Sequence, residues 1–248
     1  MKKSVFSLLF VLLPSWLFAQ VGRYRSEFAA GVNGGYVLGN VGFLPKVTQG
    51  LHGGMTGGLT LRYTSEKYFN TLCSIYAEVN YVQGGWKENI VDLKDRPVVN
   101  AVTGLAEEYG RTINYIQVPV FAHLAWGKES RGVQFFFQAG PQFGYMLNEK
   151  TSLNFALDNV NLKDRANKET AQYGMPVEHK FDYGIVAGVG VEYTLPKVGH
   201  VLLDARYYYA LANIYGDSKR DYFARSNLSN VVVKLSYLFD MTRTNNKK

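Results

Sequence analysis

The sequence predicts an all-β protein, an eight-stranded antiparallel transmembrane β-barrel with long external loops and short periplasmic turns. Three observations carry this prediction. Apolar residues alternate with polar residues or glycine in eight segments, each segment is long enough to cross a bilayer, and long and short connections alternate along the chain. A period of two indicates a strand, because successive side chains of a strand point to opposite faces.

The first 19 residues have the features of a secretory signal peptide. Lys2 and Lys3 precede an apolar core, and Ala19 at its end provides a small-residue cleavage site. The alternative is a membrane anchor helix, which Pro14 and the small residue at the end disfavour. The resulting division of the chain is a signal peptide over 1–19, a barrel domain over 20–240 and a polar C-terminal tail over 241–248.

The composition excludes several other classes of protein. The single cysteine, Cys73, provides neither an intramolecular disulfide nor a thiolate metal site. The formal net charge of +7 is spread along the chain without a basic stripe between aromatic residues, so we expect no nucleic-acid partner. After the signal peptide, no apolar run reaches the roughly 18 residues of a transmembrane helix.

The first three expected strands, 26–38, 54–64 and 72–83, each carry an apolar face on alternate residues. The next three, 112–126, 132–146 and 181–195, repeat the pattern. In 181–195, FDYGIVAGVGVEYTL, aromatic residues stand near both ends of an aliphatic face, and the opposite face is mostly glycine. Aromatic ends suit the two interfaces of a bilayer, and this length exceeds that of a usual strand in a soluble sheet.

The last two expected strands, 200–213 and 228–239, complete the set of eight. The connections between strands then alternate between long and short without exception, which a soluble sandwich does not require. With the N-terminus starting in the periplasm, every long connection is external. Ring closure leaves no sheet edge exposed to lipid. The expected connections are 39–53, 65–71, 84–111, 127–131, 147–180, 195–199 and 214–227.

The lumen of an eight-stranded barrel is just wide enough for side chains to fill it. Six charged residues on the inward faces, three of each sign, fall in the periplasmic half of the barrel. Buried charges are tolerated when they are paired, so we interpret this cluster as a structural plug, with a proton or ion path as the alternative. The cluster consists of Arg62, Glu78, Glu192, Asp204, Arg206 and Lys234.

The residues that could carry catalysis are scattered. Of the four histidines, His52 and His179 fall in external loops, His123 in the lumen and His200 at a periplasmic turn. His179 lies near Asp182 in the sequence, and a serine such as Ser152 could approach them, which is a weak constellation. The chain has no HExxH, CxxC or Walker motif. We therefore expect no enzymatic activity, no cofactor and no metal site.

Four segments resemble the outer-membrane β-barrel family of Bacteroidetes, and the resemblance covers nearly the whole chain after the signal peptide. The size of the chain and its long second and third external loops, 84–111 and 147–180, are similar to those of PorT. PorT-type barrels are associated with type IX secretion, which moves proteins such as gingipain proteases across the outer membrane. The four segments are YIQVPV at 115–120, QAGPQFG at 138–144, FDYGIVAGVGVEY at 181–193 and VVVKLSYLF at 231–239.

The resemblance implies a cell outer-membrane protein required for secretion of type IX cargo, acting as an accessory because so narrow a lumen cannot pass a folded protein. It implies outer-membrane lipid, the assembly machinery and other type IX components as partners. Tyr237 and Phe239 become a candidate assembly signal, although DMTRTNNKK follows Phe239, whereas many such barrels end on the aromatic residue. Two alternatives stay open: a generic structural or adhesive barrel, and a lipid-modifying outer-membrane enzyme.

Overall fold

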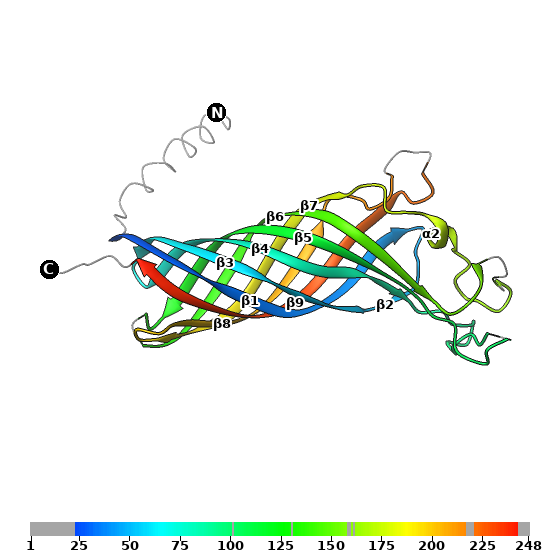
Figure 1. The fold of residues 1–248 in the computed structure, drawn as a ribbon, viewed down its shortest axis with the longest axis horizontal. Helices are drawn as coiled ribbons and strands as arrows, with labels where there is room; N and C mark the ends of the chain where they lie inside the picture. The colour runs from blue at the N-terminus through cyan, green and yellow to red at the C-terminus, as the bar shows by residue number, and fades with distance from the viewer. Residues whose placement is uncertain are drawn as a thin grey trace, which may run out of the picture.

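The computed structural model describes residues 23–100, 102–129, 131–157, 160, 162–216 and 221–242. The expected signal peptide, its cleavage site and the chain beyond Thr242 lie outside these residues. Within the described part, eight long strands form an elongated barrel (Figure 1). None of the helices found there is long and apolar enough to span a membrane.

All eight predicted strands are present, together with two short elements near one end of the barrel. The short elements are β2 (Gln49–Gly50) and α2 (Ala171–Gly174). The long strands are β1 (Arg23–Leu44), β3 (His52–Tyr68), β4 (Thr71–Glu88), β5 (Tyr109–Gly127), β6 (Gly132–Leu153), β7 (Phe181–Leu195), β8 (Gly199–Ala210) and β9 (Arg225–Thr242).

The strand ends differ from the predicted ones where pairing or capping overrides the apolar pattern. The β5–β6 ladder continues to the pair Tyr109–Leu153, so seven residues predicted to begin a loop belong to β6. Strand β8 is shorter than predicted and ends at Ala210 rather than at 213, because the side-chain amide of Asn227 donates a hydrogen bond to the Ala210 carbonyl at 3.1 Å. Strand β9 extends to Thr242, so the first two residues of the expected tail belong to the barrel.

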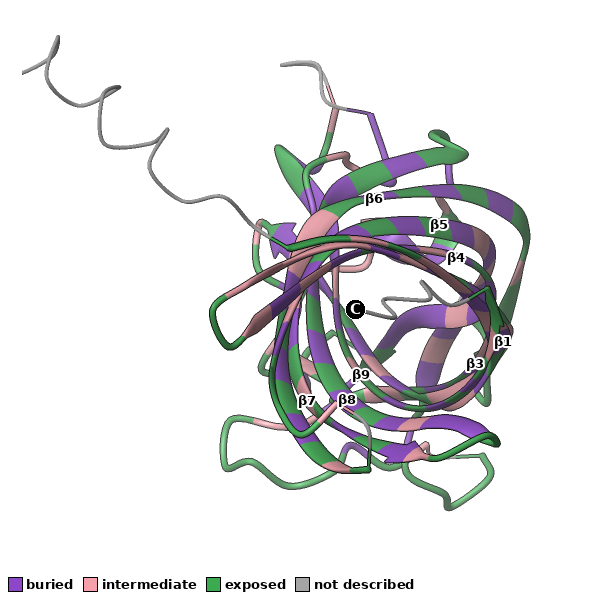
Figure 2. Cartoon of the chain, turned by 90° about the vertical axis from the view of Figure 1, so that its left-hand side faces the viewer, coloured by how far each residue is buried: buried purple, intermediate pink, exposed green. Residues whose placement is uncertain are grey.

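The sheet closes on itself, which confirms the predicted fold class. Strand β1 pairs with both β3 and β9, and β4 pairs with β5, so the order runs β1-β3-β4-β5-β6-β7-β8-β9 and back to β1. All of these pairings are antiparallel. Figure 2 looks along the barrel and shows the strands as a ring.

The connections alternate in length as predicted. Those at 69–70, 128–131 and 196–198 lie at one end of the barrel, here called the short-turn end, where β1 also begins and β9 finishes (Figure 1). The others gather at the opposite end, here called the long-loop end. They cover residues 45–51, 89–108, 154–180 and 211–224.

Burial follows the alternation along the strands. Outward aliphatic side chains such as Leu59, Ile185 and Val189 are 58–61% exposed, and lumen-facing side chains are almost fully buried. The inward glycines make room for large neighbours. A Cβ atom on Gly190 would lie 2.4 Å from Cζ of Phe136, which fills the lumen beside it.

Candidate functional site: the charged lumen and the external cap

The lumen contains a buried ion-pair network centred on Glu78. Its two carboxylate oxygens accept hydrogen bonds from both terminal nitrogens of Arg206, at 2.8 and 2.9 Å, and from Nζ of Lys234 at 2.8 Å. Arg206 also donates to Asp204 at 3.1 Å. Strands β4, β8 and β9 supply these side chains, each at most 6% exposed, so the network joins opposite walls of the barrel.

A second group lies nearer the short-turn end. The guanidinium of Arg62 donates to Glu192 at 2.7 Å and to the hydroxyl of Tyr76 at 3.2 Å. The imidazole of His200 lies between two carboxylates, with Nδ1 2.6 Å from Glu192 and Nε2 3.0 Å from Asp240. The six predicted charges are therefore all buried in the lumen, but in two groups, and His200 and Asp240 join the second.

Neutral polar residues continue the filling of the lumen. Nδ2 of Asn33 lies 2.8 Å from the hydroxyl of Thr60 and 2.9 Å from Oδ1 of Asn80. Closer to the long-loop end, the hydroxyl of Tyr208 donates to Asp182 at 2.7 Å. Polar side chains therefore fill the lumen along its length, but some of them, such as Gln117 through Nε2 and His123 through both ring nitrogens, have no hydrogen-bond partner among the described residues.

The long loops form an ordered structure, here called the external cap, built around Arg165. This guanidinium is 2% exposed and donates to Glu107 at 2.6 Å and to the hydroxyl of Tyr173 at 2.7 Å. The Tyr173 hydroxyl in turn donates to Glu88 at 2.7 Å. Burial, and then the Glu88 carboxylate, raise the pKa of the Tyr173 phenol. One chain of contacts therefore connects the end of β4 with the 89–108 and 154–180 loops.

An aromatic cluster and Arg111 attach the 211–224 loop to the cap. Arg111 donates to the hydroxyl of Tyr215 at 3.0 Å and to the carbonyl of Met175. The ring of Tyr215 packs at 5.7 Å from Phe223, whose ring lies 4.9 Å from that of Phe43 on β1. These buried rings sit over the long-loop end of the lumen.

The histidines do not form a catalytic constellation within the described residues. His123 is stacked between Tyr76 and Phe136, with ring centroids 4.3 and 4.6 Å away. His52 begins β3 rather than lying in a loop, and its Nε2 is 3.1 Å from the hydroxyl of Thr112.

The weak constellation considered from the sequence is not assembled. His179 is exposed in the 154–180 loop, and Ser152 is exposed on β6, which extends further than predicted. The Asp182 carboxylate is instead buried against Tyr208 in the lumen. Among the described residues, no hydrogen bond joins these three side chains.

The two residues of the candidate assembly signal lie on the outer face of β9. Tyr237 and Phe239 are 36% and 47% exposed, and their rings are 6.5 Å apart. The Tyr237 hydroxyl donates to the carbonyl of Val198 in the turn before β8. Both rings therefore stand at the short-turn end of the outer face.

The sequence did not predict the external cap. Glu88 and Arg111 continue the inward parity of β4 and β5 a few residues beyond the predicted ends, so longer strands would have placed both inside. Arg165 and Glu107 are 58 residues apart in separate loops, and no local pattern in the sequence indicates their pairing.

The closed ring, the apolar outer face and the charged lumen define the chain as an eight-stranded transmembrane β-barrel. The family model described as "Outer membrane protein beta-barrel domain" matches residues 18–216, and the chain belongs to this family. The protein therefore resides in the outer membrane, with its apolar face in lipid, its long loops external and its short turns periplasmic. A comparison with curated proteins gave no match.

Several solved structures are similar to the chain at low sequence identity. Ail of Yersinia pestis, in complex with the heparin analogue sucrose octasulfate, is 14% identical over 86% of this chain and 99% of that one, with a TM-score of 0.36. OprG of Pseudomonas aeruginosa is 13% identical over 88% and 98%, with a TM-score of 0.42. Neisserial surface protein A is 11% identical over 86% and 97%, with a TM-score of 0.38.

The topology makes a prediction that can be checked on intact cells. A protease site inserted after Lys163, in an external loop, should be cleaved by added protease, because the loop projects from the cell surface. A site inserted after Lys128, in a periplasmic turn, should be cleaved only after the outer membrane is permeabilised. Immunoblotting of the fragments measures both, and the reverse pattern would overturn the orientation.

Proposed function

We propose that this barrel is a PorT-like accessory protein of type IX secretion, required for delivery of cargo such as gingipain-like proteases to the cell surface, and that it is not the conduit. The family resemblance over 115–120, 138–144, 181–193 and 231–239 supports the secretion role. The filled lumen is the observation that supports the second part of the proposal, that the barrel is not the conduit. Arg206, Glu78 and Lys234 span the ring, and aromatic rings cover its external end.

The external cap supports a role in contacting other proteins. Its loops are held by buried contacts such as Arg165 with Glu107, so the surface is ordered before a partner arrives. Preordering lowers the entropy cost of association. In this proposal the barrel is an anchor in lipid, and the cap is the surface through which it acts on secretion components.

The filled lumen predicts that the barrel does not conduct ions. Purified protein in planar bilayers should show no large steady conductance, because the paired side chains of the lumen leave no continuous aqueous channel. The comparison is a general porin reconstituted in the same lipid at the same protein amount. Long-lived porin-like openings would contradict a structural plug and would favour an ion path.

The secretion role is tested by deletion of the gene. Type IX cargo should accumulate unprocessed in the periplasm, and surface protease activity should fall to near background, as measured by immunoblotting of fractions and a surface proteome. Wild-type protein should restore secretion, and a variant with the 89–108 loop replaced by a short linker should not, provided that it folds and reaches the outer membrane. Normal secretion in the deletion strain would reject the proposal.

Histidine variants distinguish the accessory role from catalysis. Alanine at His52, His123, His179 or His200, one at a time, should leave secretion near normal in variants that fold, because no histidine stands in a catalytic arrangement. A changed lipid A profile in the deletion strain, restored by wild type but not by His179→Ala, would instead favour a lipid-modifying enzyme.

A second candidate function is adhesion at the cell surface. The cap exposes large apolar side chains far from the lipid face, with Leu93 87%, Val102 93% and Leu105 62% exposed. Exposed apolar side chains that lie close together often mark binding surfaces. Loss of cell aggregation or surface attachment in the deletion strain, with normal cargo secretion, would favour this structural or adhesive barrel.

We also propose that Tyr237 and Phe239 act as the assembly signal on β9, although the chain continues beyond them. Their outward position leaves them accessible to the assembly machinery until lipid surrounds the strand. Phe239→Ala should lower the amount of folded barrel in the outer membrane, and Phe137→Ala, on the outer face of β6, is the matched control. Equal amounts of both variants would exclude this role.

A further inference from the structure

Strand β6 continues beyond its neighbour β7 at the external end of the barrel. The β6–β7 ladder ends at the pair Tyr145–Phe181, whose rings are 54% and 55% exposed on the outer face. Such outward aromatic rings stand at the interface of the bilayer, so the residues beyond them lie outside the lipid. Residues 148–153, here called the β6 edge, pair with β5 on one side. On the other side, no strand pairs with them in the part of the chain that the structure describes.

One hydrogen bond at the end of the β6 edge indicates which backbone groups face the open side. The N–H of Asn154 bonds to the Glu108 carbonyl at 3.3 Å, on the side of β5. Backbone groups of a strand point to its two sides alternately. Ser152 and Lys150 therefore direct their backbone groups to β5 as well. The open side receives the N–H and C=O groups of Glu149, Thr151 and Leu153.

The open side exists because the chain that precedes β7 turns into the cap. The N–H groups of Glu178 and His179 both bond to the carbonyl of Ile214, at 3.0 and 3.2 Å. The N–H of Val177 bonds to the side chain of Glu149 at 3.2 Å, not to its backbone. Among the described residues, no backbone hydrogen bond reaches the β6 edge from its open side.

An unpaired row of backbone groups is a template for another strand. The groups on the open side recur at every second residue, about 7 Å apart. An extended polypeptide carries donors and acceptors in the same order and at the same spacing, whereas lipid head groups and saccharides do not. Thr151 and Ser152 are exposed, so an incoming strand can reach the edge. The chemistry of the β6 edge therefore selects a polypeptide.

The side chains of the β6 edge add a preference for one charge. Glu149 is already 3.5 Å from Arg111 in the cap. Lys150 lies on the outer face opposite Thr112, is exposed, and has no ion pair among the described residues. Opposite charges that face each other across two paired strands are favourable. An acidic side chain opposite Lys150 would therefore strengthen the pairing.

We propose that the β6 edge binds an extended segment of another surface protein by strand addition, antiparallel to β6 and with an acidic side chain opposite Lys150. The place of this contact in secretion rests on the accessory role proposed above, whereas the binding itself is a property of the purified barrel. A second copy is not the occupant, because all copies insert with the same end outward. Their β6 strands run in the same direction and cannot pair antiparallel.

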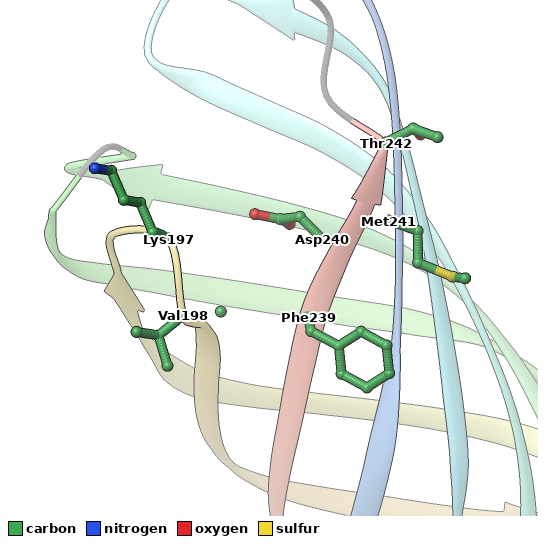
Figure 3. Close-up of a pocket in the computed structure, with 7 residues that line it drawn as sticks. Lys197, Val198, Phe239, Asp240, Met241 and Thr242 are labelled. Atoms are coloured by element: carbon green, nitrogen blue, oxygen red, sulfur yellow. The ribbon is translucent and has the colours of Figure 1, made fainter.

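A shorter edge at the opposite end of the barrel is the competing site. The ladder between β8 and β9 ends at Leu238, and residues 239–242 of β9 continue beyond it. Figure 3 shows the groove of about 370 Å³ beside these residues, lined also by Lys197 and Val198 from the turn before β8. This edge has fewer backbone groups than the β6 edge and lies on the periplasmic side. The β6 edge should therefore be the preferred site of an added strand.

A synthetic peptide tests strand addition on the purified, full-length barrel in detergent micelles. The probe has seven residues, with threonine at odd positions, valine at positions two and six, and glutamate in the centre. With the glutamate opposite Lys150, the threonine N–H groups face the edge and the valine N–H groups face away. Fluorescence anisotropy of the labelled peptide measures the affinity.

The position of backbone methyl groups on the probe should decide its affinity. N-methylation of the two threonines beside the glutamate should weaken binding by roughly 10-fold or more, because two hydrogen bonds are lost. N-methylation of the two valines is the matched control and should leave binding nearly unchanged. Equal affinities of the two methylated peptides, or no saturable binding at millimolar concentration, would overturn the proposal.

Variants of the barrel locate the binding site. Thr151→Pro removes an N–H from the open side and should abolish binding, whereas Thr151→Val keeps this N–H and should retain it. Lys150→Glu should reverse the preference, so that a peptide with lysine in the centre binds better than the one with glutamate. Heat-modifiable migration on gels verifies folding. Binding that is unaffected by Thr151→Pro would place the peptide elsewhere, for example beside 239–242, and would overturn the assignment.

The same pair of variants separates this contact from the secretion role itself. In the deletion strain, Thr151→Val should restore secretion of cargo, and Thr151→Pro should not, although both reach the outer membrane. Full secretion with Thr151→Pro would show that the β6 edge is not the contact used, while the barrel is still required. Normal secretion in the deletion strain itself would reject the accessory role and leave the peptide result standing.

Discussion

Replacement of Glu78 by alanine is expected to destabilise the barrel by about 3–5 kcal/mol, the cost of breaking a buried ion pair by removing one partner. The variant leaves Arg206 without its bidentate acceptor and Lys234 without its acceptor at 2.8 Å. Both cations are almost fully buried, so water cannot replace the carboxylate without entering the lumen. Urea unfolding in lipid vesicles, followed by tryptophan fluorescence, measures the change.

The control for this experiment is Glu178→Ala. Glu178 is an exposed carboxylate in the 154–180 loop, and its removal should change the unfolding free energy by less than about 0.5 kcal/mol. If Glu78→Ala behaved like this control, the lumen network would not stabilise the barrel, and its interpretation as a structural plug would be wrong.

Replacement of Arg165 by alanine is expected to loosen the external cap without unfolding the barrel. Glu107 loses a buried partner from another loop, and Tyr173 loses one from its own loop, whereas no ladder pair of the barrel is affected. A local cost of about 3 kcal/mol corresponds to a roughly 100-fold larger open population. When opening is fast, proteolysis follows that population, so external loop cleavage should accelerate by a similar factor.

Limited proteolysis of the purified barrel, analysed by mass spectrometry, measures this rate. Lys168→Ala removes a cation from the same loop, outside the contacts with Glu107 and Tyr173, and should leave cleavage nearly unchanged. The unfolding midpoint of the transmembrane part should be close to wild type in both variants. Equal cleavage rates would show that the buried contacts of Arg165 do not order the cap.

The two regions have different consequences for function. The lumen network joins β4, β8 and β9 across the ring, so it affects the stability of the whole barrel. The cap contacts join loops to one another and to strand ends, so they affect the surface presented outside the cell. Variants in the lumen and the cap can therefore separate loss of the barrel from loss of a partner surface.

The sequence alone determined the architecture of the barrel. Strand formation, the direction of each side chain and the long–short parity of connections follow from a period of two, which each segment displays locally. Glu78 and Arg206 could be placed inside by the same count, because inward parity needs only the segment that contains the residue. The eight-stranded ring then follows from bilayer-length strands that cannot leave an edge in lipid.

Only the tertiary structure decided which charges meet. Glu78 and Lys234 are 156 residues apart, and the shear of the closed ring, not the local sequence, brings them to 2.8 Å. The same applies to the inclusion of His200 and Asp240 in the second group. In the cap, Arg165 and Glu107 have no strand parity to place them, since loop conformation is set by long-range packing. Local alternation specifies faces, whereas ring closure and loop packing specify partners.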